Sequence, residues 1–122
     1  MKISDARDVD DLLGDIIEWG SRIFTYIATT SEDEFHRGTL KQDAVIRCLE
    51  VMGEAAGHLL RISPGFQEQH PELALREAYR ARNRTAHGYG SVNLGAVWQS
   101  AHGPAQEMVT AARLVLAARR QS

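Results

Sequence analysis

"LKQDAVIRCLEVMGEAAGHLLRI", residues 40–62, is the stretch of the chain that decides the fold. Apolar residues recur in it every three or four positions, which is the period of a helix with one buried face. That face comprises Val45, Leu49, Met52, Ala56 and Leu59, flanked by Ile46, Gly53 and Leu60. Gly53, Ala55, Ala56 and Gly57 are small, so another helix can approach this one closely. The stretch predicts a long helix that packs against its neighbours.

The same period appears towards the N-terminus. Residues 5–30 predict an amphipathic helix of about six turns, with Ser4 as its cap and acidic residues in its first turns. Residues 31–38 predict a short capped turn of helix that ends at Gly38.

The chain after residue 62 continues the helical pattern. Residues 63–71 have the Pro and Gly content of a loop. Pro71 can open a further helix, which Gly88 and Gly90 should end.

The last segment, residues 91–122, is also helical in pattern, but Gly103-Pro104 interrupts it and predicts a kink or two helices. No sustained alternation typical of strands occurs. We therefore expect an all-α fold, a single domain over residues 1–122 built as an up-and-down bundle of about four or five helices.

The composition is that of a globular protein, with 122 residues of which 43% are apolar and 25% charged. No apolar run approaches the roughly 18 residues that span a bilayer. The first residues lack the apolar segment of a signal peptide, and the single Cys48 can form no internal disulfide. We expect a cytoplasmic protein without membrane association. Because metal-binding motifs are absent, we expect neither a metal nor a cofactor.

The charges are distributed unevenly along the chain. The net charge is −2, yet residues 1–35 hold nine acidic and three basic residues. From Ala78 to Gln106 there is no acidic residue, only Arg80, Arg82 and Arg84 among the charged ones. That local field attracts anions, although a solvated helix face would carry the same charges.

"RARNRTAHGYG", residues 80–90, lies within this basic region. On a helix, Arg76, Arg80 and Arg84 form one stripe of like charge, which a bound polyanion such as RNA would relieve. Arginine suits phosphate because its planar fork is always charged. Histidine suits acid–base work near neutral pH. Arg82 and His87 therefore form a candidate site for RNA cleavage by the 2′-hydroxyl, which needs no metal.

Arg82 and His87 lie five positions apart, about 140° around a regular helix, so they cannot both face one phosphate from the same chain. Either the helix unwinds near Gly88, or the two residues come from different chains across a twofold axis. Asn83 shares a face with His87 and can orient it or donate to a phosphate oxygen.

The pattern resembles the HEPN superfamily and, within it, the HepT-like toxins of toxin–antitoxin pairs. Their motif of Arg, four residues, His, any residue and Tyr is matched by "RNRTAHGY", with Arg82, Asn83, His87 and Tyr89. The stretches "AVIRCLEVMGEAA", "HPELALREAYRARN" and "VNLGAVW" resemble other parts of the family, so that the resemblance covers about residues 8 to 118. Gly90 departs from the family, where an aromatic residue is common.

The resemblance implies a helical bundle that forms a homodimer through the motif face, and a metal-independent endoribonuclease. It implies a cognate partner as well, a minimal nucleotidyltransferase that acts as antitoxin. In part of the family this partner transfers AMP to the motif tyrosine, here Tyr89.

Alternatives remain open for each of these residues. Arg82 can instead form an ion pair with Glu54 on the neighbouring helix, and Glu54 can at the same time orient Arg82 from behind. Arg76, Arg80 and Arg84 can be a solvated face instead of an RNA track. The whole protein can be a non-catalytic RNA- or nucleotide-binding subunit that accompanies a nucleotidyltransferase, or a scaffold with a merely polar dimer interface.

Overall fold

The computed structural model describes residues 5–87 and 92–121 of the chain, and every regular element within these ranges is helical. This confirms the all-α prediction. The described ranges contain seven α-helices and one 3-10 helix: α1 (Asp5–Ile27), α2 (Glu32–Arg37), α3 (Thr39–Ile62), α4 (Phe66–Gln69), η1 (Pro71–Leu73), α5 (Leu75–His87), α6 (Leu94–His102) and α7 (Pro104–Arg120). No helix in these ranges is both long enough and apolar enough to cross a membrane.

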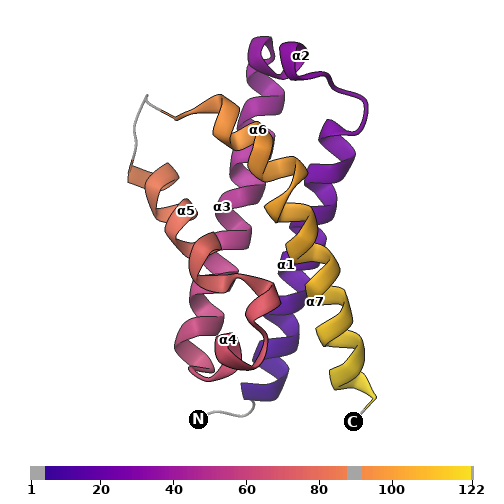
Figure 1. Ribbon diagram of the computed structural model, residues 1–122, viewed down its shortest axis with the longest axis vertical. Helices are drawn as coiled ribbons and strands as arrows, with labels where there is room; N and C mark the ends of the chain where they lie inside the picture. Colours follow the sequence, from indigo (N-terminus) through magenta and orange to yellow (C-terminus); the bar gives the residue numbers. More distant parts are fainter. Residues whose placement is uncertain (1–4, 88–91, 122) are drawn as a thin grey trace.

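The long helices run up and down beside one another, as Figure 1 shows. Helix α3 lies between α1 and α5, and α7 packs against the other side of α1. The short helix α6 crosses the upper part of the bundle and contacts α7, α3 and α1. The predicted up-and-down arrangement is confirmed, with α5 at one edge of the bundle.

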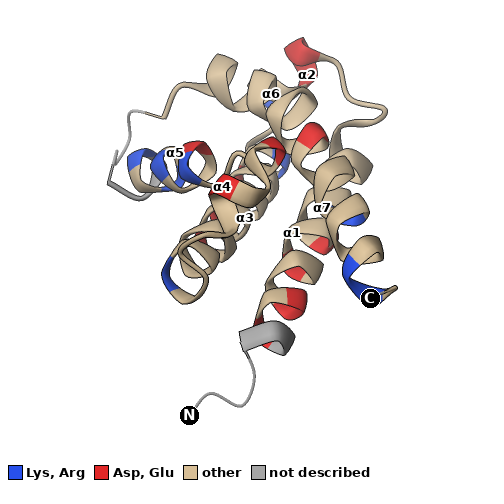
Figure 2. Ribbon diagram, turned by 60° about the horizontal axis from the view of Figure 1, so that its bottom comes forward, with Lys and Arg blue, Asp and Glu red and all other residues tan. Residues whose placement is uncertain are grey.

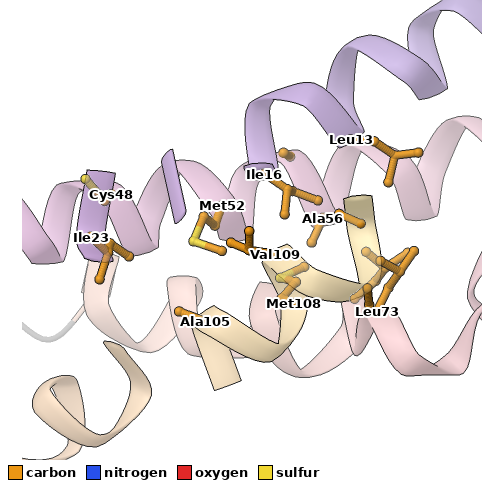
Figure 3. Close-up of a cluster of buried hydrophobic side chains, with 14 of the residues drawn as sticks. Leu13, Ile16, Ile23, Cys48, Met52, Ala56, Leu73, Ala105, Met108 and Val109 are labelled. Carbon is orange, nitrogen blue, oxygen red and sulfur yellow. The ribbon is translucent and has the colours of Figure 1, made fainter. Parts of the chain in front are cut away.

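The core forms where α1, α3 and α7 meet, as in the cluster of Figure 3. The side chains of Leu13, Ile16 and Ile23 on α1 are fully buried, and Met52 on α3 and Val109 on α7 are nearly so. Burying each such side chain stabilises the fold by about 1.5–3 kcal/mol relative to leaving it in water. Cys48 also lies in this cluster, where burial raises the pKa of its thiol.

Two expected helix boundaries are confirmed. Ser31 caps α2: the Glu34 backbone N–H donates to Ser31 Oγ at 3.1 Å, and the Ser31 N–H donates to Glu34 Oε1 at 2.8 Å. The hydrogen bond that the Ser31 backbone N–H donates to the Glu34 carboxylate lowers the pKa of Glu34. Gly103-Pro104 separates α6 from α7, because a proline fits the first turn of a helix and not its interior.

Two other boundaries were predicted wrongly. The segment expected to be a loop contains α4, and Pro71 opens the short η1 instead of α5. These two turns bury Phe66 and Leu73 against the core, which an open loop would leave in water. Helix α5 begins only after Ala74, whose positive φ of 52° redirects the chain.

Candidate functional site

Helix α5 packs directly on α3 because two positions of α3 have no side chain. A Cβ built on Gly53 would lie 2.3 Å from the Cβ of Arg82 and 2.8 Å from the carbonyl oxygen of Ala78. A Cβ built on Gly57 would lie 2.4 Å from the ring of Tyr79. These distances are too short for real contacts, so the two glycines permit the observed approach. The close approach predicted from the small residues is confirmed, and it fixes where Arg82 stands.

The guanidinium of Arg82 is held by two acceptors. Its Nη2 donates to Glu54 Oε2 at 3.1 Å, and its Nη1 donates to Asn83 Oδ1 at 3.1 Å. Glu54 follows Gly53 on α3. The glycine that permits the close approach of α5 is therefore adjacent to the glutamate that binds Arg82. The ion pair anticipated from the sequence is therefore present.

Arg82 nevertheless stays accessible, since 28% of its side chain is exposed. A guanidinium has five N–H donors, and the contacts with Glu54 and Asn83 use two of them. Within the described part of the chain no further acceptor contacts this group, so donors in its fixed plane can bind the oxygens of a phosphate, and the group is already oriented before any ligand arrives.

Asn83 contacts Arg82, and its expected contact with His87 involves a side chain outside the described residues. Its Oδ1 accepts from Arg82, which leaves its amide NH2 group as the part that can donate elsewhere. His87 is the last residue of α5, and its side chain lies outside the described part of the structure. Tyr89 lies outside the described residues altogether.

Two of the three arginines in the α5 stripe form ion pairs with carboxylates of the same chain, so the stripe carries less unpaired charge than the sequence suggested. Arg76 Nη2 lies 2.7 Å from Glu68 Oε2, and Arg80 Nη2 lies 3.8 Å from Glu77 Oε2. The hydrogen bond from Arg76 lowers the pKa of Glu68. Exposed ion pairs of this kind are weak, at about 0–1 kcal/mol. Within the described residues no carboxylate lies within 4.0 Å of Arg84, so the stripe keeps one unneutralised charge next to Arg82.

The blue ribbon segments of α5 in Figure 2 mark this basic helix, while the red segments of α1 lie across the bundle from it. Helix α3 stands between the two, so the acidic and basic helices do not neutralise each other by contact. An anion approaching the molecule is therefore drawn to the α5 side.

No local pattern in the sequence indicated a cavity beside Arg82. A hollow of about 450 Å³ lies between α5 and the α6–α7 pair, with α3 as its floor. Leu49, Met52 and Met108 line it, and Arg82 and Arg84 stand in its wall. The site thus combines an oriented guanidinium, a second arginine and an apolar cavity.

Comparison with known proteins shows the family of the chain. The family model described as ribonuclease HepT-like matches residues 16–112. Two Methanocaldococcus jannaschii proteins named as RNases are each 32% identical over 95 residues, which cover 78% of this chain and 76% and 79% of theirs. A Thermococcus cleftensis protein named as a ribonuclease HepT is 33% identical over 94 residues, 77% of this chain and 83% of its own. No solved structure matches the chain significantly.

Proposed function

Because the chain belongs to the ribonuclease HepT-like family, we propose that it is a metal-independent RNA endonuclease whose site combines Arg82 and His87 at a homodimer interface. Membership of the family supports ribonuclease activity. The observation that carries the proposed site is the guanidinium of Arg82, which is oriented by Glu54 and Asn83 and still accessible.

In the proposed reaction, one His87 removes the proton of a ribose 2′-hydroxyl. The 2′-oxygen then attacks the adjacent phosphorus while the bond to the 5′-oxygen breaks, and the His87 of the other chain protonates the leaving oxygen. Arg82 binds the non-bridging oxygens, where negative charge accumulates in the transition state. The products are a 2′,3′-cyclic phosphate and a free 5′-hydroxyl, and the balance of atoms requires no added reactant.

The regularity of α5 favours a site shared between two chains. The helix continues to His87, and positions five apart on a regular helix are separated by about 140° around its axis. A twofold axis beside α5 brings the Arg82 of each chain towards the His87 of the other. A single chain would have to unwind its last turn to do the same.

We further propose that a minimal nucleotidyltransferase is the antitoxin partner and that it transfers AMP from ATP to the Tyr89 hydroxyl, releasing pyrophosphate. The added phosphate, two residues along the chain from His87, would repel RNA. Mass spectrometry after incubation with the partner and ATP should detect the added AMP on the native chain and none on Tyr89→Phe. An unchanged addition on the variant would place the modification on another residue.

The decisive experiment compares His87→Ala with His58→Ala, which removes an exposed histidine from α3. Each protein is incubated with RNA in EDTA, and its oligomeric state is measured by analytical ultracentrifugation. We expect His87→Ala to lose cleavage and cyclic-phosphate products while it remains a dimer, and His58→Ala to match the native protein. Cleavage at the native rate by His87→Ala would refute the assignment.

The same assay distinguishes the alternative function. RNA binding that weakens with salt, without any cleavage by the native protein, would identify a non-catalytic RNA-binding subunit. In that case Arg82, Arg84 and the rest of the basic helix would still bind anions, but His87 would have no catalytic role.

A further inference from the structure

We propose that the cavity between α5 and the α6–α7 pair binds one unpaired nucleobase of the RNA, next to the phosphate that Arg82 holds. This inference rests on the proposed function, because it assigns the substrate's base to a place beside the same arginine. It adds a recognition site that the motif residues do not supply.

The first support is the size and depth of the cavity. Its volume of about 450 Å³ falls within the roughly 300–1,000 Å³ of pockets that hold small molecules. Its inner lining belongs to the folded core, since Met52 on α3, Val97 on α6 and Met108 on α7 are all nearly inaccessible. The pocket is therefore preformed by packing, and a ligand need not order it.

The second support is the chemistry of the walls. Bases taken out of a helical stack are held between apolar or aromatic side chains, and here the walls are aliphatic and thioether groups. Methionine sulfur makes favourable contacts with aromatic rings, and both Met52 and Met108 line this pocket. The alanines of the wall, Ala78, Ala81 and Ala105, keep the space open.

The third support is the placement of polar groups in the lining. The Asn93 Oδ1 already accepts from the Ala96 backbone N–H at 3.0 Å, so the Asn93 amide NH2 is the part available to a ligand. Ser100 contributes a hydroxyl that can donate or accept. Two such groups can meet the edge of a base, as specific recognition of single-stranded RNA requires.

The fourth support is charge. Arg82 and Arg84 belong to the lining, while the single carboxylate there, Glu77, lies 3.8 Å from Arg80. A base in the cavity is joined through its ribose to phosphates, and these are the groups that two arginines would bind. An apolar protein segment would match the floor of the cavity but not this cationic wall, so the observations favour a nucleotide over a second protein.

The test uses binding, not cleavage, so that it is independent of His87. The probes are a short 2′-O-methyl oligoribonucleotide, which lacks the attacking hydroxyl, and a base-free oligomer with the same number of phosphates. Ala96→Phe adds a ring at an exposed position of the lining. Gln99→Phe adds the same ring to an exposed position of α6 outside the lining and serves as the matched control.

The native chain and Gln99→Phe should bind the oligoribonucleotide about tenfold more tightly than the base-free oligomer, the order expected for one stacked base. Ala96→Phe should bind both probes equally. Equal binding of the two probes by the native chain would overturn the base pocket. So would an Ala96→Phe chain that keeps the preference but changes from dimer to monomer, since the groove would then be a protein interface.

The outcomes also separate this inference from the proposed function. A native chain that prefers the oligoribonucleotide but cleaves no RNA would retain the pocket and lose the nuclease. A native chain that cleaves RNA through His87 without any base preference would retain the nuclease and lose the pocket.

Discussion

At the scale of single residues, the ability of Arg82 to bind a phosphate depends on the residues around it as much as on its own charge. Glu54 and Asn83 fix the plane of its guanidinium through two hydrogen bonds. An arginine held in this way spends less conformational entropy when it binds a phosphate. Glu54, which itself repels RNA, is thus proposed to act as a positioning residue.

This role makes opposite predictions for binding and for rate. Replacing Glu54 by Gln removes a negative charge next to the phosphate site, so RNA should bind no more weakly than to the native chain. The less firmly held Arg82 should lower kcat about tenfold, the order of one charge-assisted hydrogen bond. Single-turnover kinetics with a fluorescent RNA measures both quantities.

Glu50→Gln provides the comparison, because Glu50 is on the same helix and lies near Arg47, at 3.9 Å, and not near Arg82. If Glu54→Gln and Glu50→Gln behaved alike, the carboxylate of Glu54 would have no part in positioning the arginine.

At the scale of elements, the packing of α5 against α3 determines where the candidate site lies. The two glycines of α3 let α5 lie close enough for Glu54 to reach Arg82. No other long helix of the described chain packs extensively on α5. The position of the basic helix therefore depends mainly on this one contact.

Gly53→Ala tests that dependence. Its new methyl would meet Arg82 and the Ala78 carbonyl, so we expect the free energy of unfolding to fall by about 1–3 kcal/mol, as for other overpacked positions. RNA cleavage should also fall at temperatures where the variant is fully folded, because α5 must move away from α3. Urea unfolding and single-turnover cleavage measure the two effects.

Gly14→Ala is the matched control within α1. Nothing lies within 4 Å of a Cβ built on Gly14, so alanine there should raise the free energy of unfolding by about 0.5–1 kcal/mol through the smaller entropy of the unfolded chain. Equal stability changes in Gly53→Ala and Gly14→Ala would mean that α5 does not rely on this close contact.

The sequence predicted these elements to the extent that local patterns determine them. The three-to-four period located α1, α3 and α7, and the small residues of α3 predicted a close approach by another helix, which the structure identifies as α5. The start of α5 was missed because a proline opens an α-helix and a 3-10 turn equally well. Only the need to bury Phe66 and Leu73 decides where the chain turns.

The site was predictable in part for the same reason. The Arg82–Glu54 pair was an alternative that the sequence analysis left open, and the structure contains it. The partner of Arg76 was missed because Glu68 lies in α4, which was expected to be a loop. The cavity was missed because it depends on the spacing between α5 and α7, which no local pattern encodes. The catalytic roles of Arg82, Asn83 and His87 stay predictions.

At the scale of the whole molecule, the distribution of charge matters more than its total of −2. Basic residues gather on α5 at one edge of the bundle and acidic ones on α1, with α3 between them (Figure 2). Helix α7 carries further arginines beside α1, where Arg119 pairs with Asp10. A polyanion is thus attracted to the α5 edge more than to the acidic face of α1, which favours productive orientation on first contact.

The salt dependence of RNA affinity measures how many phosphates the residues of the α5 side neutralise. Replacing Arg84 by Gln should weaken RNA binding and reduce the slope of log affinity against log salt by about 1, the effect of one lost phosphate contact. Arg113→Gln, on α7 beside Ser21, should leave the slope unchanged. Identical slopes for Arg84→Gln and the native protein would exclude Arg84 from the RNA-binding surface.

The missing side chain at residue 53 has a practical consequence for enzyme engineering. Because α5 packs against the backbone of α3 at this position, successively larger side chains at residue 53 would increase the separation between the two helices in steps. A series from alanine through serine to valine would shift the guanidinium outward in small steps without altering any group that touches RNA. Turnover plotted against side-chain size would reveal how much misplacement the chemistry tolerates.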